Sequence, residues 1–247
     1  MKRSKNKMTE KEKKETKSEK RQIVIPGEII AKGDDVLPGD WTIRKDKDII
    51  ATRFGVLDKS DRLVKVMPLS GRYIPRRGNV VIGVIEDLTM KGWIVDIEAP
   101  YSAFLLLKEC PMFIKESEMD SVYNVGDLFV GKIFNVGRGS IDLTTKGRGL
   151  GKIKDGIIIK VNPNRVPRII GKEGSMIKLI KTASDCEITV GQNGLIWIKG
   201  EETEDELFAE KAINFVNENT IVEGLTEKVE DWLKKNKKSS KKEEKKE

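Results

Sequence analysis

Two glycines three residues apart, Gly171 and Gly174, interrupt an apolar helical pattern in RIIGKEGSMIKLI, residues 168–180. The two residues between them, Lys172 and Glu173, are both charged. Glycine lets a backbone turn sharply and lets another chain come close, and the free amides at the start of a helix attract phosphate oxygens. We therefore expect a tight connection between two helices whose backbone binds the phosphates of a polyanion.

Cationic side chains gather around this connection. Residues 165–181 carry five Lys and Arg side chains against Glu173 alone. We expect the amides from Gly174 to Met176 to receive phosphate, with the cations adding counter-charge and Glu173 weakening the contact slightly. The residues expected to bind there are Gly171, Lys172, Glu173, Gly174, Ser175, Arg168 and Lys178. A plain helix-helix turn, with glycines chosen for packing, is the alternative.

The net charge of +7 over 247 residues is concentrated at the two ends of the chain. Residues 1–21 hold ten Lys and Arg against four Glu, and residues 234–247 hold eight Lys against three Glu. The body between them is mildly acidic, which makes the cationic cluster at 165–181 stand out. Both ends lack apolar residues to bury, so we expect disordered tails. They are either solvated ends or sources of non-specific attraction to phosphate.

The residue inventory argues against an enzyme. The chain has no histidine, which removes the commonest general base and metal ligand. Cys110 and Cys186 form no paired motif and are expected to be reduced core residues. The acidic run at 201–206 opens a predicted helix, where carboxylates complement the macrodipole. We expect no metal and no cofactor. No apolar run approaches 18 residues, so no membrane segment is expected and the cytoplasm is the expected location.

The chain is predicted to be a multidomain α+β protein. Short extended runs broken by turn residues predict a small N-terminal β-domain over residues 22–77. Five strand segments, with a longer excursion between the third and fourth, predict an OB-type barrel over residues 78–149. Residues 152–220 read as β-α-α-β-β-α, with Asn193-Gly194 as a hairpin turn because both residues tolerate positive φ. A closing helix is predicted over residues 221–233.

These patterns resemble a known family. RIIGKEGSMIKLI resembles the signature of KH domains, which grip single-stranded RNA through a G-x-x-G loop and read about four nucleotides. Residues 78–148 are similar to the OB barrel of ribosomal protein S-one. The order of β-domain, barrel and KH, with G-Q-N-G at 191–194, is similar to the RNA-binding cap subunit of the archaeal exosome.

The resemblance implies a function for each part of the chain. Such a cap is not itself the nuclease. Three copies lie on a six-membered ring of phosphorolytic 3′-to-5′ ribonuclease subunits, with the barrels around the opening through which single-stranded RNA enters. By this resemblance, residues 22–77 are a docking domain for the ring, and the protein feeds RNA to the ring during degradation and processing.

The barrel departs from the pattern of its relatives. Barrels of this kind often stack bases on two aromatic residues and a histidine, at positions that correspond here to Lys91, Ile94 and Leu106. We therefore expect an electrostatic contribution from Lys91, Lys132 and Arg138 rather than base stacking. Ordinary solvated charge is the alternative for these three residues.

Two other functions compete with the cap. A barrel followed by KH also occurs in a class of transcription or translation factors, although that class usually has two tandem KH units. An enzyme in its own right is the weakest reading, because the sequence lacks histidine, paired cysteines and a Walker-type phosphate loop.

Overall fold

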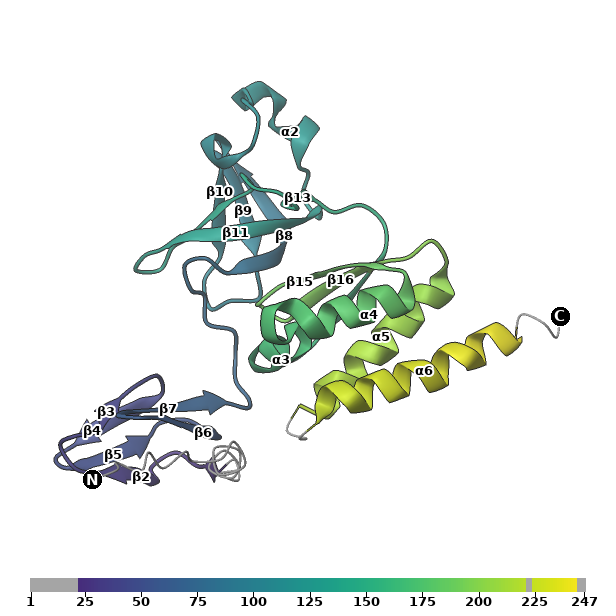
Figure 1. Cartoon of the computed structure of the whole chain (residues 1–247). Coiled ribbons are helices and arrows are strands. Elements are labelled where there is room, and N and C mark those ends of the chain that lie inside the picture. The colour runs from purple at the N-terminus through teal and green to yellow at the C-terminus, as the bar shows by residue number, and fades with distance from the viewer. Residues whose placement is uncertain (1–21, 221–223, 244–247) are drawn as a thin grey trace, which may run out of the picture. The chain divides into compact units, whose positions relative to one another are not determined.

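The computed structural model describes residues 22–220 and 224–243 of the 247-residue chain (Figure 1). The chain divides into two compact units, with the boundary between Ser70 and Gly71. This boundary precedes the predicted end of the β-domain at 77, because Tyr73 is buried in the barrel core and donates a 2.9 Å hydrogen bond to the Asn79 side chain. The predicted tail at residues 1–21 lies outside the described residues.

The N-terminal unit is built from strands alone, as the turn-rich sequence predicts. The strands are β1 (Ile23–Val24), β2 (Ile29–Lys32), β3 (Leu37–Pro38), β4 (Thr42–Lys45), β5 (Asp48–Ala51), β6 (Gly55–Ser60) and β7 (Leu63–Pro68). They form a four-stranded sheet in the order β1-β6-β7-β3 and a three-stranded sheet in the order β2-β5-β4. The core draws side chains from both sheets, among them Val24, Ile49 and Val66.

The second unit begins with the predicted closed five-stranded barrel. Its strands are β8 (Val80–Thr89), β9 (Gly92–Asp96), β10 (Ala103–Leu106), β11 (Leu128–Val136) and β12 (Ile141–Thr144). The strand order is β12-β10-β9-β8-β11, and pairing of β11 with β12 closes the barrel. A short β13 (Gly151–Lys152) adds to β11. The barrel core is apolar, and Trp93 at its centre donates a 3.1 Å hydrogen bond to the Tyr123 carbonyl.

The excursion between the third and fourth barrel strands contains short helical segments separated by irregular backbone. It contains the 3₁₀ turns η1 (Leu107–Glu109) and η2 (Glu116–Glu118) and the short helix α2 (Met119–Val122). Met119 and Tyr123 anchor it in the barrel core.

The KH domain follows with the predicted β-α-α-β-β-α order. Its elements are β14 (Ile157–Lys160), η3 (Pro163–Arg165), α3 (Val166–Ile170), η4 (Lys172–Gly174), α4 (Ser175–Ser184), β15 (Glu187–Val190), β16 (Leu195–Lys199) and α5 (Thr203–Glu218). The antiparallel sheet has the order β14-β16-β15. An apolar core joins one face of this sheet to α3, α4 and α5.

The closing helix is longer than the sequence predicted. Helix α6 covers Leu225–Glu243, so the first ten residues of the predicted tail at 234–247 are helical. Lysine and glutamate are good helix formers, which is sufficient to extend a helix that is already anchored. The helix is anchored by the buried Leu225, Val229 and Leu233 and by Trp232, whose ring stacks on Phe208 and Phe215 of α5 at centroid distances of 5.9 and 5.4 Å.

The barrel and the KH domain share a buried apolar interface. The face of the KH sheet turned away from its helices contributes Leu195, Ile158 and Trp197, which join outward-facing barrel residues such as Ile82 and Val130. Both faces of the KH sheet are therefore covered, one by helices and one by the barrel (Figure 1).

Candidate nucleic-acid interface

The G-x-x-G loop connects two helices in a conformation that requires its glycines. Gly171 ends α3 at φ 75°, ψ 175°, and Gly174 precedes α4 at φ 78°, ψ 14°. Glu173 between them is also left-handed, at φ 53°. Three positive φ angles in four residues turn the chain through the shortest connection, and leave Lys172 and Glu173 exposed at its tip.

The two glycines are constrained by different neighbours. A Cβ placed on Gly171 would lie 2.7 Å from the Met176 amide nitrogen and 2.8 Å from the Met176 Cβ. A Cβ on Gly174 would meet nothing closer than the Lys178 Cε at 3.8 Å. Gly171 is thus required by close packing as well as by its backbone angles, whereas Gly174 is required by its angles alone.

The loop satisfies part of its own hydrogen bonding. The Gly174 amide donates to the Gly171 carbonyl at 3.3 Å, and the Ser175 amide donates to the Lys172 carbonyl. The phosphate-binding site predicted at the amides from Gly174 to Met176 therefore has fewer free donors than expected, because two of these amides already donate to carbonyls inside the turn. The lysine side chains gain importance for any contact with phosphate.

The predicted cations of the KH domain lie around this loop. Lys172 is exposed at the tip of the loop, and Lys178 is exposed on α4 with its aliphatic stem beside Gly174. Arg168 lies half-buried in the last turn of α3 and makes an interaction of its own within the protein. Ser175 is exposed at the first turn of α4, and the buried side of that helix holds Met176 and Ile180.

The structure does not bring the predicted barrel cations together. Lys91 lies in the turn between β8 and β9, next to Leu107, whose amide donates to the Lys91 carbonyl. Arg138 lies in the turn between β11 and β12, at the opposite end of β10. Lys132 lies within β11 and pairs with Val80 and Thr144. All three side chains are exposed, but they lie at three separate places on the barrel and do not form one cationic patch.

Phe104 is an outward-facing aromatic residue that sequence reasoning missed. Its neighbours Ala103 and Leu105 are fully buried in the barrel core, so Phe104 points to the outer face, where it is half-buried. It pairs with Ile94 on one side and Asp142 on the other. The alternation in SAFLLL could have revealed it, because successive strand residues point to opposite faces. The outer face of the third barrel strand therefore does offer an aromatic ring.

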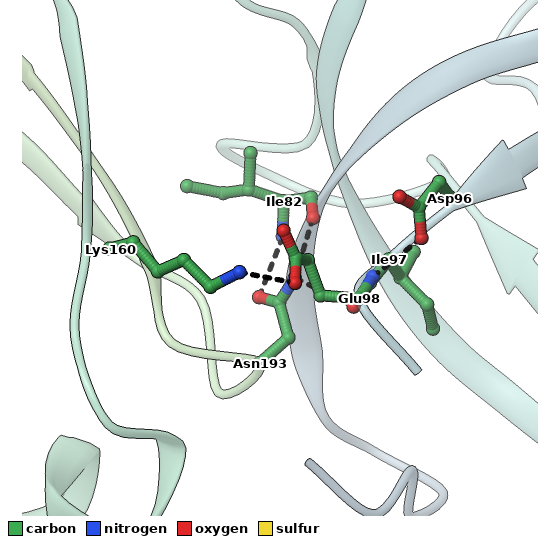
Figure 2. A network of polar contacts seen from close by, with 6 residues as sticks. All are labelled: Ile82, Asp96, Ile97, Glu98, Lys160 and Asn193. Atoms are coloured by element: carbon green, nitrogen blue, oxygen red, sulfur yellow. Dashed lines mark hydrogen bonds and ion pairs between the residues drawn. The ribbon is translucent and has the colours of Figure 1, made fainter. Parts of the chain in front are cut away.

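The hairpin of the KH sheet is buried against the barrel rather than exposed. Asn193 retains only 2% of its surface. Its side-chain nitrogen donates to the carbonyls of Ile82 at 2.7 Å and Ile97 at 3.0 Å, and its oxygen accepts from the Ile82 amide at 3.3 Å (Figure 2). Next to it, the Lys160 ammonium lies 2.5 Å from a carboxylate oxygen of Glu98.

Two further hydrogen bonds join the hairpin of the KH sheet to the barrel. The Gln192 amide donates to the Val80 carbonyl at 2.8 Å, and the Gln192 side chain accepts from the Val80 amide at 2.5 Å. The hairpin therefore fixes the KH domain to the barrel, and the strand end that it closes is unavailable to RNA. The G-x-x-G loop and the outer side of α4 instead carry exposed side chains, Lys172 and Lys178 among them.

The described residues show no other site with recognisable chemistry. Within residues 22–220 and 224–243, no group of three or more His, Cys, Asp or Glu side chains is arranged to hold a metal ion. In the same residues, no helix is long and apolar enough to cross a membrane. Cys110 and Cys186 are both free and buried, and burial raises the pKa of each thiol above its usual value.

Comparison with known proteins agrees with this architecture. Residues 156–204 match the family described as KH domain, and residues 21–70 match the N-terminal domain of the exosome RNA binding protein RRP4. A solved structure described as an exosome complex RNA-binding protein superposes with a TM-score of 0.61 at 32% identity, covering 69% of this chain and 99% of that one.

Three archaeal relatives carry the description "Exosome complex component Rrp4". The relative from Methanothermobacter thermautotrophicus is 38% identical over 86% of this chain and 68% of its own length. The relative from Methanobrevibacter smithii is 39% identical over 87% of this chain and 72% of its own length. The relative from Nitrosopumilus maritimus is 36% identical over 88% and 98%. With identities of this size across nearly the whole described chain, the protein belongs to the archaeal Rrp4 family of exosome subunits.

Proposed function

We propose that the protein is a non-catalytic RNA-binding subunit that caps a ring of phosphorolytic 3′-to-5′ ribonuclease subunits and feeds single-stranded RNA to it. The observation that carries this proposal is the exposed loop from Gly171 to Gly174. Its tip presents Lys172, and Lys178 of α4 lies beside Gly174 at the end of the loop, on a KH domain that is fixed to a barrel by buried contacts. A rigid support lets the loop hold an RNA backbone at a constant position relative to the barrel.

The contact with RNA follows from the geometry of the loop. The lysine ammonium groups at 172 and 178 attract phosphate oxygens, and both side chains are exposed to solvent, where an RNA backbone can approach them. The hairpin at 191–194 is covered by the barrel, so the bound strand lies along the loop and α4. Contacts of this kind hold a strand without reading much sequence.

The barrel supplies a second place for RNA. Phe104 on its outer face can stack on a base, an interaction typically worth about 1–3 kcal/mol. Lys91, Lys132 and Arg138 are exposed on three sides of the barrel and attract phosphate over longer distances. The proposed path therefore combines one clamp on the KH domain with weaker contacts on the barrel.

The remaining parts of the proposal rest on the family. Relatives are described as exosome complex components, and a similar solved structure is described as an RNA-binding protein of that complex. A non-catalytic role agrees with a sequence that contains no histidine. Docking of the N-terminal unit on the ring, three copies per ring and a cytoplasmic location are the corresponding proposals for this chain.

The loop is tested by a double substitution, Lys172→Asp with Glu173→Asp. It removes the cation at the tip and adds a carboxylate, while both glycines and hence the turn are retained. We expect RNA affinity in a filter-binding assay to fall about tenfold, because a phosphate contact is replaced by repulsion. The slope of affinity against salt concentration is expected to flatten as well.

Lys211→Asp is the matched control, since it makes the same charge change on an exposed position of α5. It is expected to leave RNA binding close to that of the wild type. Equal loss in both variants would mean that total charge, and not the loop, governs binding. Phosphate-dependent shortening of RNA by the purified chain alone would contradict the non-catalytic role, and recovery of RNA polymerase in place of ring subunits in a pull-down would contradict the cap.

A further inference from the structure

The three-stranded sheet of the N-terminal unit carries an apolar row on its solvent side. Ile29 of β2 pairs with Ile50 of β5, which pairs with Ile43 of β4. Ile30 and Ile49 point the other way and are buried in the core. The row therefore lies on the outer face and crosses every strand of the sheet.

The two end members of the row, Ile29 and Ile43, are exposed to an extent that folding does not require, whereas Ile50 between them is half-buried. Ile29 keeps 47% of its surface and Ile43 keeps 53%. Residues 22–70 hold eight of the sixteen large apolar side chains that are exposed in the described chain, although they form less than a quarter of it. Exposed apolar groups concentrated in one small unit indicate a surface that a partner covers.

A charged row runs beside the apolar one. Asp48 of β5 pairs with Lys32 of β2 on one side and with Lys45 of β4 on the other. A bulge in β2 between Ile29 and Ala31 returns Lys32 to the same face as Ile29. The outer face thus has an apolar row bordered by two lysines with one aspartate between them.

The charge of the whole unit argues that its partner is a protein rather than RNA. Residues 22–70 contain eight basic and eight acidic side chains and therefore have no net charge. A nucleic-acid surface needs an excess of cations to displace the counterions of the phosphates. An apolar centre with a narrow charged border is instead the composition of a protein interface.

The other outer face of the unit is less suited to this role. On the four-stranded sheet, Ile23 and Met67 are exposed at one end and Leu37 and Leu63 at the other. The Lys65 ammonium, 3.2 Å from an Asp58 carboxylate oxygen, lies between these two apolar ends. An ion pair in the middle of a face must lose water when a partner covers it, which disfavours burial.

We propose that the row Ile29–Ile50–Ile43, with Lys32 and Lys45 at its border, is the face by which the N-terminal unit docks on a ribonuclease subunit of the ring. The matching surface has an apolar centre and carboxylates opposite the two lysines. This inference rests on the proposed cap function and specifies its protein contact. It assigns the docking to one face of one sheet.

The test uses the full chain and the purified six-membered ring of ribonuclease subunits from the same organism. The variant Ile29→Ser with Ile43→Ser removes the two exposed members of the row and is expected to weaken binding to the ring by at least about tenfold. Ile29→Thr with Ile43→Thr retains β-branched side chains and guards against a loss of folding. It is expected to weaken binding in the same direction, with an unchanged melting temperature.

The matched control is Ile23→Ser with Met67→Ser, which removes similar exposed area from the other sheet. It is expected to bind the ring as the wild type does. Lys32→Glu with Lys45→Glu is expected to weaken binding at low salt and to lose less affinity as salt rises, because its border repels the partner's carboxylates. RNA affinity of the isolated chain is expected to stay unchanged in all four variants.

Each contrary outcome overturns a different statement. If the wild type binds the ring and the isoleucine variants bind equally well, the docking face is wrong while the cap function stands. If the wild type does not bind the ring, the cap function itself fails. If the isoleucine variants expand the isolated chain in small-angle scattering, the row is covered by the chain's own second unit. If they lose RNA affinity, the row binds RNA instead of protein.

Discussion

Gly171 and Gly174 illustrate how two identical residues in one motif have different physical roles. The sequence predicts a tight turn at both, and the positive φ angles agree. The sequence does not reveal that Met176 approaches Gly171 closely, because that contact depends on the angle between α3 and α4. The loop has fewer free amides than its sequence indicated, because the Gly174 and Ser175 amides donate to carbonyls within the turn.

Alanine substitutions are expected to separate the two glycines. Gly171→Ala places a Cβ against the Met176 amide in a backbone region that only glycine adopts, and should cost about 2–4 kcal/mol of unfolding free energy. In Gly174→Ala the added Cβ lies in open space, so the only cost is the strain of a left-handed backbone, about 1 kcal/mol of unfolding free energy. Urea denaturation of both variants measures the difference. Equal losses would show that the packing around Gly171 yields easily.

At the scale of elements, the hairpin between β15 and β16 was predicted correctly, but the reason given for its asparagine was incomplete. Asn193-Gly194 indicates a hairpin turn because both residues tolerate positive φ, yet only Gly194 adopts it, at 92°. Asn193 instead donates and accepts three hydrogen bonds with barrel residues about 100 positions away in the sequence. Its amide serves the junction between two domains, which no local pattern can show.

Asn193→Leu is expected to loosen this junction. The substitution keeps the branching of the side chain but leaves the Ile82 amide and the Ile82 and Ile97 carbonyls without their buried partner, which should cost about 3–5 kcal/mol. Gln192→Ala removes one bond from a half-buried side chain and should cost about 1 kcal/mol. Urea unfolding followed by fluorescence measures both. A loss for Asn193→Leu no larger than that of Gln192→Ala would contradict the role of this junction.

The other elements differ in how far nearby residues are enough to predict them. The five barrel strands and the KH helices were predicted correctly, because apolar periodicity and turn residues mark them within short windows. Helix α6 was predicted too short, since charge alone indicated a tail although lysine and glutamate also favour helix. The outward position of Phe104 was missed because three fixed positions were considered in place of the alternation along its strand.

At the scale of the whole molecule, the absence of histidine from the sequence leaves few groups that titrate near neutral pH. Burial raises the pKa of the two cysteine thiols and raises that of Tyr123 to about 12. Burial also raises the pKa of Tyr73 well above its usual value. The molecule therefore has buried groups that stay protonated in the folded state when they would ionise in the unfolded chain.

Stability is consequently expected to be nearly constant from about pH 6 to pH 8 and to fall above about pH 9, where the unfolded chain begins to ionise the two thiols that burial keeps protonated in the folded protein. In that upper range the unfolded chain releases the Tyr73 and Tyr123 protons while the folded protein retains them, so rising pH favours unfolding. The urea midpoint measured from pH 6 to pH 11 checks this. Tyr123→Phe should reduce the alkaline fall, and a steep change between pH 6 and pH 8 would contradict the expectation.

The sequence by itself determined the order of the domains, most of the strands and helices, and the presence of the G-x-x-G loop with its cations. These features depend on residues close together in the chain, whose periodicity and turn chemistry leave a local pattern. The exposed tip of the loop remains a predicted RNA-binding site. Its glycines and the surrounding cations lie within one short stretch of the sequence, so the sequence alone indicates its chemistry.

The tertiary structure alone decided which surfaces are covered. The burial of Asn193 and the isoleucine row across β2, β5 and β4 both depend on strand order and register. The separation of Lys91, Lys132 and Arg138 depends on them as well. Register places residues from distant segments on one face, and a shift of one residue would reverse that face. Such information arises only when the strands pair.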